Sequence, residues 1–187
     1  MDEFSYLSVL LSVVLGLAIA EILQGFRARM LSSQQVRRFW PSEVWAAILL
    51  LICTQTWWAM FGLRNRHDWQ FDDFMVLLAQ TITLYLAAGL VFPDFPPGEA
   101  VDLRQHYFAQ RRPFFGLILL TILISIGRDL VLNHALPDRA NLLFHLGYIA
   151  LAVAGIASAR EWLHKALALV TAAFVLLYVS LLFARLH

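Results

Sequence analysis

The chain has 187 residues, of which 60% are apolar and only 14% are Asp, Glu, Lys or Arg, and its mean hydropathy is +0.69. Soluble domains are about half apolar and about a quarter charged, so this composition excludes a water-soluble fold. The net charge is +1 and no block of basic residues is present, which gives no indication of nucleic-acid binding. A single cysteine, Cys53, excludes an internal disulfide and a cysteine-rich zinc site.

Six apolar stretches are each long enough to cross a bilayer, because a spanning helix needs about 20 mainly apolar residues. They cover residues 4–25, 43–63, 74–92, 114–133, 141–158 and 163–184. Runs such as residues 46–52 lack the alternation of polar and apolar residues that a membrane barrel strand requires. We therefore predict an all-α fold, a six-helix transmembrane bundle in which residues 1–187 form a single domain.

Basic residues are divided unevenly between the loops on the two sides of the predicted bundle. The loops after spans one, three and five contain nine of them: Arg27, Arg29, Arg37, Arg38, Arg104, Arg111, Arg112, Arg160 and Lys165. The opposite side contains four: Arg64, Arg66, Arg139 and Arg185. Loops rich in Lys and Arg usually stay in the cytoplasm. We therefore predict a cell-membrane protein with both termini on the outer side, in the inner membrane if the host is a bacterium.

The loop between spans three and four combines basic and apolar residues. Leu103, Tyr107 and Phe108 fall on one side of a short predicted helix. Such a helix is expected to lie at the membrane surface, where its arginines contact lipid headgroups. The arginines in question are Arg104, Arg111 and Arg112. A specific site for an anionic lipid or a partner is the alternative interpretation.

Six spans divide into two groups of three. An odd number of spans per half places the halves in opposite orientations, as in many transporters and channels. Spans one and four resemble each other weakly, and their alignment places Glu21 opposite Asp129. We predict either two inverted three-helix halves or six helices without internal symmetry.

Beyond the first turn of each predicted span, three charged residues lie inside the spans, where a charge costs about 3 kcal/mol on insertion scales. Glu21 is late in the first span and is expected to reach either Arg27 or the headgroup layer. Arg128 and Asp129 are late in the fourth span. Adjacent residues of a helix point about 100° apart, so we expect each of these two to find its partner on another helix or in water. They form either interhelix ion pairs or a polar pathway that opens to the outside.

Uncharged polar residues occur in the middle of several spans. Gln55, Gln80 and His145 lie on three different spans, and Tyr148 shares a helical face with His145. Their convergence would form a central polar cavity in which His145 is the group that titrates near neutral pH. The alternative is a set of packing contacts, each worth about 0.6 kcal/mol. The candidate cavity residues are Glu21, Gln55, Gln80, Arg128, Asp129, His145 and Tyr148.

Small residues recur every four positions along the first span. They are Ser8, Ser12, Gly16 and Ala20. Small residues at this spacing allow two helix backbones to approach closely. We predict that this stripe packs against a helix of the same chain or, alternatively, against another subunit of a homo-oligomer.

The sequence contains no cluster of metal-ligand spacing, no Gly-rich phosphate loop and no Gly-x-Ser-x-Gly motif. Five histidines other than His145 are assigned to loops or to the ends of spans. We therefore predict no catalytic residues, no metal and no cofactor, with the lipid bilayer as the main partner. The pattern favours a small channel or transporter-like protein for an ion or small polar solute. The alternatives are an accessory subunit of a larger membrane complex and, third, a membrane enzyme or cofactor-binding protein.

Overall fold

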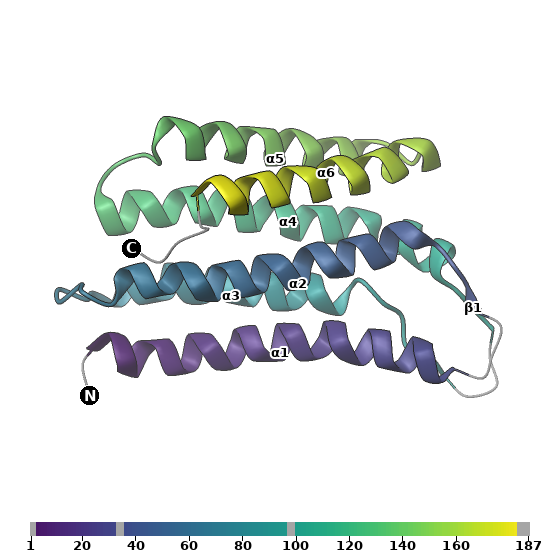
Figure 1. Ribbon diagram of the computed structural model, residues 1–187, viewed down its shortest axis with the longest axis horizontal. Coiled ribbons are helices and arrows are strands. Elements are labelled where there is room, and N and C mark those ends of the chain that lie inside the picture. Colours follow the sequence, from purple (N-terminus) through teal and green to yellow (C-terminus); the bar gives the residue numbers. More distant parts are fainter. Residues whose placement is uncertain (1–2, 33–35, 97–99, 183–187) are drawn as a thin grey trace.

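The computed structural model describes residues 3–32, 36–96 and 100–182, and these fold into a bundle of six long helices (Figure 1). The helices are α1 (Glu3–Leu31), α2 (Trp40–Met60), α3 (Phe71–Gly89), α4 (Leu103–Asn133), α5 (Arg139–Ala157) and α6 (Glu161–Leu182). Each is long and apolar enough to cross a bilayer. The chain is therefore an all-α integral membrane protein, which confirms the predicted fold class. Residues 183–184, predicted to end the sixth span, and Arg185 lie outside the described residues.

Two helices are longer than the predicted spans. α1 continues to Leu31 instead of ending near residue 25, and α4 begins at Leu103 instead of near residue 114. The Asp102 side chain caps α4, because its Oδ1 accepts hydrogen bonds from the backbone N–H groups of Arg104 (2.8 Å) and Gln105 (3.0 Å). The predicted separate interfacial helix is therefore wrong, since this capped segment continues through Pro113 into the span. With 31 residues, α4 is about 46 Å long and extends beyond a hydrocarbon layer of about 30 Å.

The helices do not pack in simple chain order. α1 packs against α3, α3 against α4 and α4 against α5, while α2 packs against α6 (Figure 1). Within the first three helices the most extensive contact is between α1 and α3, whereas within the last three it is between α4 and α5. Different pairs of helices therefore pack together in the two halves of the bundle. The predicted arrangement of two inverted halves stays a prediction.

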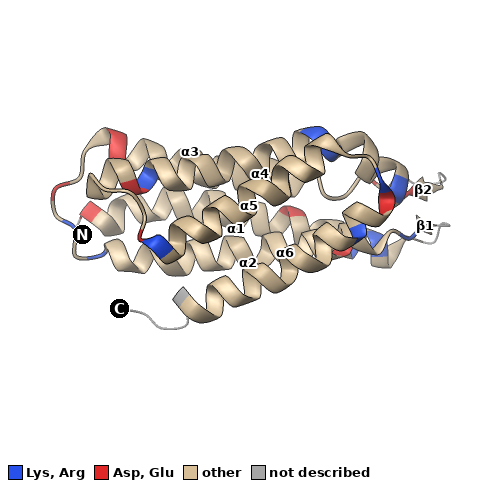
Figure 2. Cartoon of the chain, turned by 90° about the horizontal axis from the view of Figure 1, so that it is seen from above, with Lys and Arg blue, Asp and Glu red and all other residues tan. Residues whose placement is uncertain are grey.

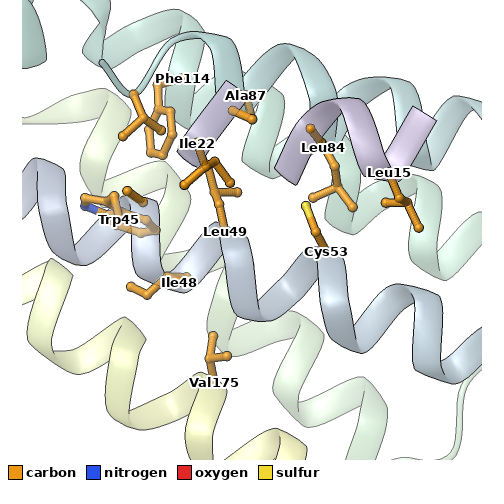
Figure 3. Close-up of a cluster of buried hydrophobic side chains, with 14 of the residues drawn as sticks. Leu15, Ile22, Trp45, Ile48, Leu49, Cys53, Leu84, Ala87, Phe114 and Val175 are labelled. Carbon is orange, nitrogen blue, oxygen red and sulfur yellow. The ribbon is translucent and has the colours of Figure 1, made fainter. Parts of the chain in front are cut away.

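Buried apolar side chains cluster where α1, α2 and α3 meet (Figure 3). Leu15 of α1, Leu49 and Cys53 of α2, and Leu84 and Ala87 of α3 are almost completely buried there. Side chains of this size fit between closely spaced helices and make the van der Waals contacts that hold helices together in lipid. Cys53 acts here as a small apolar side chain.

The stripe of small residues on α1 does not follow the buried face of that helix. The buried positions are Leu11, Leu15, Ala18 and Ile22. Gly16 is exposed, and a Cβ atom added to it would have no neighbour within 4 Å. Residues four apart advance by about 400°, so the stripe Ser8, Ser12, Gly16 and Ala20 drifts by about 40° per step around the helix. The prediction that it packs within the chain is wrong at Gly16, and its role between subunits stays a prediction.

Close approaches occur at other glycines, one of which, Gly155, lies on α5. A Cβ atom added to Gly155 would lie 2.6 Å from Cδ1 of Phe115, whose ring is fully buried. Only a residue without a side chain lets α4 and α5 pack at this distance.

One end of the bundle is tied together by a short parallel strand pair. β1 (Val36–Arg37) lies between α1 and α2, and β2 (Val101–Asp102) lies between α3 and α4. Arg37 Nη1 is 3.2 Å from Asp102 Oδ2. Hydrogen bonds from the backbone N–H groups of Gln105 and Arg104, together with the Arg37 charge, lower the pKa of Asp102 below its ordinary value. Charged residues gather toward the two ends of the bundle (Figure 2).

Candidate functional site

A cavity of about 100 Å³ lies between α2, α4, α5 and α6. α4 packs against α5, α5 against α6 and α6 against α2, but α2 and α4 contact each other only slightly. The ring of four helices is therefore incompletely filled at its centre, and α3 contributes to the cavity wall at its side. The polar residues of the wall are Gln55, Thr56, Gln80, Thr121, Ser125, His145, Tyr148, Thr171 and Tyr178.

The wall of this central cavity is mainly apolar and carries several uncharged polar groups. Among the described residues that line it, none is Asp, Glu, Lys or Arg. Apolar side chains such as Ile52, Leu84 and Val175 form much of the remaining surface. A mainly apolar wall with a few polar groups is typical of sites for small molecules.

His145 is held in one orientation on the cavity wall. Its Nδ1 is 2.7 Å from the carbonyl oxygen of Asn141, and its Nε2 is 3.0 Å from Ser125 Oγ. Because a carbonyl oxygen only accepts, Nδ1 carries the proton, and in the neutral ring Nε2 accepts from the Ser125 hydroxyl. The side chain of Asn141 accepts a hydrogen bond from the Tyr178 hydroxyl at 3.2 Å. These contacts connect α4, α5 and α6 around the cavity.

Three polar atoms on the cavity wall have no hydrogen-bond partner within the described part of the chain. They are Gln80 Oε1, Tyr148 Oη and Thr171 Oγ1. Gln80 and Thr171 are only 7% and 4% exposed. Buried polar groups are almost always hydrogen-bonded to protein, water or a ligand. The cavity therefore offers hydrogen-bonding positions to a molecule inside it.

A second cavity, of about 250 Å³, adjoins the central cavity on the side of the α2–α3 and α4–α5 connections. Thr56 and Gln80 line both cavities. Arg128 and Asp129 line only the second one, which we call the outer cavity because it lies closer to an end of the bundle. Beside Gln80, the Thr83 hydroxyl donates to the Gln80 carbonyl oxygen and lies 2.9 Å from the hydroxyl of Thr121.

Arg128 and Asp129 form an ion pair with each other. Arg128 Nη2 and Nε are 3.0 Å and 3.2 Å from Asp129 Oδ1. The prediction that neighbouring residues would need other partners is wrong, because it considered only the directions of the Cβ atoms. The long arginine side chain turns back and spans the angle between the two positions.

An ion pair anchors the connection between α2 and α3 beside the outer cavity. Arg66 Nη2 is 2.9 Å from Asp73 Oδ2, and Arg66 Nη1 donates to the carbonyl oxygen of Leu132 at 2.6 Å. Asp73 is buried and also accepts from the backbone N–H of Gln70 at the start of α3. Arg66 thus fixes this connection to the end of α4, because it satisfies a helix-terminal carbonyl and a buried carboxylate together.

On the opposite side, the central cavity adjoins a narrow pocket of about 10 Å³. Trp45 lines both spaces. Ser42, Tyr107 and Arg111 also line the narrow pocket, and Ser42 Oγ and Arg111 Nε have no hydrogen-bond partner among the described residues. A volume of this size accommodates about one water molecule.

A buried histidine lies next to this narrow pocket. His164 is fully buried, its Nδ1 is 2.9 Å from the Tyr107 hydroxyl, and its Nε2 is 2.8 Å from the carbonyl oxygen of Ser158. Since Nε2 must donate to the carbonyl, Nδ1 accepts from Tyr107 in the neutral ring. The sequence places His164 at the end of a span, which the structure confirms, but it gives no indication that this histidine is buried. It lies in the first turn of α6 but faces the aromatic side chains of α4, including Phe115.

The structure brings together four of the seven candidate cavity residues. Gln55, Gln80, His145 and Tyr148 all line the central cavity. Arg128 and Asp129 lie in the adjoining outer cavity, with Gln80 at the boundary.

Glu21 is not part of either cavity. It is exposed on α1 and lines a surface pocket with Gln24 and Asp94 near the other end of the bundle. Glu21 lies on the far side of α3 from the central cavity. The sequence does not reveal this position, because it does not show which helices are neighbours.

The three arginines predicted to contact lipid headgroups have different surroundings. Arg104 Nε is 2.8 Å from Glu161 Oε2, and this carboxylate also binds Lys165 at 2.7 Å. Arg111 is half-buried at the narrow pocket, and Arg112 is exposed. Contact of these residues with lipid stays a prediction.

Sequence reasoning missed several residues of the central cavity. Trp45, Ser125, Thr171 and Tyr178 line it together with the predicted group. Thr171 is an isolated hydroxyl in an otherwise apolar run, and such a residue is a signal that can be read from the sequence. The pairing of Tyr107 with His164 joins residues that are 57 positions apart and has no comparable local signal.

Comparison of the chain with protein-family models, with curated proteins and with solved structures gives no match. Within the part of the chain that the structure describes, no three His, Cys, Asp or Glu residues are grouped so as to hold a metal ion. The fold and site define the chain as a six-helix integral membrane protein with a neutral polar cavity between its helices.

Proposed function

We propose that the protein provides a passage for a small polar solute across the membrane, as a channel or transporter does. One observation carries this proposal: three cavities follow one another through the bundle and share wall residues. Thr56 and Gln80 belong to both the outer and the central cavity, and Trp45 belongs to both the central cavity and the narrow pocket. Polar residues in membrane-spanning helices commonly mark such pathways.

The cavities decrease in size along this path, from about 250 Å³ to about 100 Å³ and then to about 10 Å³. A solute that enters beside Arg128 and Asp129 therefore reaches the central cavity but stops at the narrow pocket near Arg111. Opening of one end while the other is closed is the behaviour expected of a transporter whose substrate site lies near the middle of the membrane.

The test is a measurement of solute flux in proteoliposomes. We expect the purified protein to accelerate the entry of acetamide, followed by stopped-flow light scattering, relative to empty liposomes. Gln80→Leu should reduce this rate several-fold, because it removes the polar group at the boundary between two cavities. Gln24→Leu is the matched control, since Gln24 lines only a surface pocket on α1 and should not affect the rate.

Equal acetamide rates in proteoliposomes and empty liposomes would contradict the proposal. An equal loss of flux in the Gln80 and Gln24 variants would also contradict it, because the effect would then not depend on the shared wall.

A further inference from the structure

We infer that the central cavity is a binding site for a small neutral molecule that has a hydrogen-bonding head and a short hydrocarbon body. This inference deepens the proposed function, on which the identification of the molecule as a transported substrate rests. Three properties of the wall lead to it: its lack of charge, its volume and the placement of its free polar atoms.

The first property disfavours ions. An ion in the central cavity would meet no opposite charge among the described wall residues. His145 does not supply one in its neutral form, because its ring accepts from Ser125 and donates to Asn141. Arg128 and Asp129 belong to the neighbouring cavity and neutralise each other. A buried charge without a partner is strongly unfavourable, so a neutral molecule is preferred.

The second property limits the size of the ligand. An apolar protein cavity of about 150 Å³ is known to accommodate benzene, which has six carbon atoms. The central cavity is smaller, at about 100 Å³. By proportion it holds a molecule of about four non-hydrogen atoms.

The third property defines the head group. Gln80 Oε1 only accepts hydrogen bonds, so the bound molecule must carry a donor. The hydroxyls of Thr171 and Tyr148 accept or donate, and neither has a partner within the described residues. The surrounding apolar side chains, including Val175 and Leu84, fit a hydrocarbon body. Short alcohols and primary amides combine these features.

The experiment uses 1-propanol as the probe and the indole N–H of Trp45 as the reporter. The full chain is labelled with ¹⁵N in lipid nanodiscs, and the Trp45 signal is assigned by its loss in Trp45→Phe. We expect 1-propanol to shift this signal in a saturable manner. Propylammonium, which has the same number of non-hydrogen atoms but carries a charge, should give no saturable shift. The larger 1-hexanol should also give none, because it exceeds the cavity volume.

Two threonine variants show whether the cavity wall is responsible. Thr171→Val preserves the side-chain shape, and the loss of one hydrogen bond should weaken 1-propanol binding about fivefold. Thr54→Val is the matched control, because Thr54 is exposed and its hydroxyl donates to the carbonyl oxygen of Leu50 outside the cavity. This control should leave the affinity unchanged.

The inference is overturned if 1-propanol gives no saturable shift, if propylammonium or 1-hexanol binds as well as 1-propanol, or if both threonine variants behave alike. Its failure can be distinguished from failure of the proposed function. Saturable binding without acetamide flux supports the neutral-ligand site and contradicts the passage, whereas acetamide flux without 1-propanol binding supports the passage and contradicts this site.

Discussion

The two sides of α2 show two different ways of packing helices in a membrane. Toward α1 and α3, Leu49 and Cys53 are completely buried in a filled apolar core (Figure 3). Toward α4, α5 and α6, Ile52 and Gln55 border a cavity. Lipid is as apolar as a leucine side chain, so helices in a bilayer are held together by close contact and hydrogen bonds. Close contact on the side of α1 and α3 holds α2 in place. The side of α2 toward α4, α5 and α6 can therefore border a cavity.

The largest effect is expected on the filled side. Leu49→Ala should lower the free energy of unfolding by about 2–5 kcal/mol, because the surrounding helices cannot close over the lost volume. The measurement is an SDS titration of the protein in mild detergent, followed by circular dichroism. A loss below about 1 kcal/mol would show that this interface is less tightly packed than its burial indicates.

A substitution on the hollow side should have a smaller effect. Ile122 is buried but lines the central cavity, so part of its side chain already lacks neighbours. Ile122→Ala should therefore cost about 1 kcal/mol, at most half the loss for Leu49→Ala, in the same SDS titration. Equal losses in the two variants would remove the distinction between the two sides of α2.

Between the two sides, a hydrogen bond joins α3 to α4. Thr83→Val removes the contact between the Thr83 and Thr121 hydroxyls, which is 2.9 Å long. We expect a loss of about 0.6 kcal/mol, the average for interhelix hydrogen bonds in membranes. The thermal midpoint of the variant should fall slightly, and Thr54→Val, on the exposed face of α2, serves as its control. A large loss would show that this contact determines the helix arrangement.

A small effect, which depends on pH, is expected outside the membrane at the strand pair. The pKa of Asp102 is lowered in the folded protein, so its carboxylate adds stability above its ordinary pKa, and this contribution is lost as the pH falls through the lowered value. The partly exposed Arg37 pair limits the total to about 1 kcal/mol or less. Thermal midpoints measured between pH 7 and pH 3 should show a smaller acid-dependent decrease in Asp102→Asn than in the unchanged chain. The same decrease in both would contradict the assignment.

The candidate site was partly predictable from single residues. Gln55, Gln80 and His145 are recognisable because a polar group inside an apolar span is costly unless it has a partner or lines a cavity. Their sequence positions do not reveal which helices are neighbours. For that reason the sequence pattern groups Glu21 with them, although it lies on the other side of α3. It also assigns Arg128 and Asp129 to other partners, although the two form an ion pair with each other.

Composition and the length of the apolar runs alone determined that this chain is an all-α membrane protein with six spans, because water and lipid select strongly between apolar and charged surfaces. They also located the spans, except that α1 continues to Leu31 and that Asp102 caps a helix that continues through Pro113. Only the tertiary structure decided that α3 separates α1 from α4 and that a hollow remains among α2, α4, α5 and α6. Helix neighbours depend on the mutual fit of side chains far apart in the sequence, such as Gly155 against Phe115, and no local pattern encodes that fit.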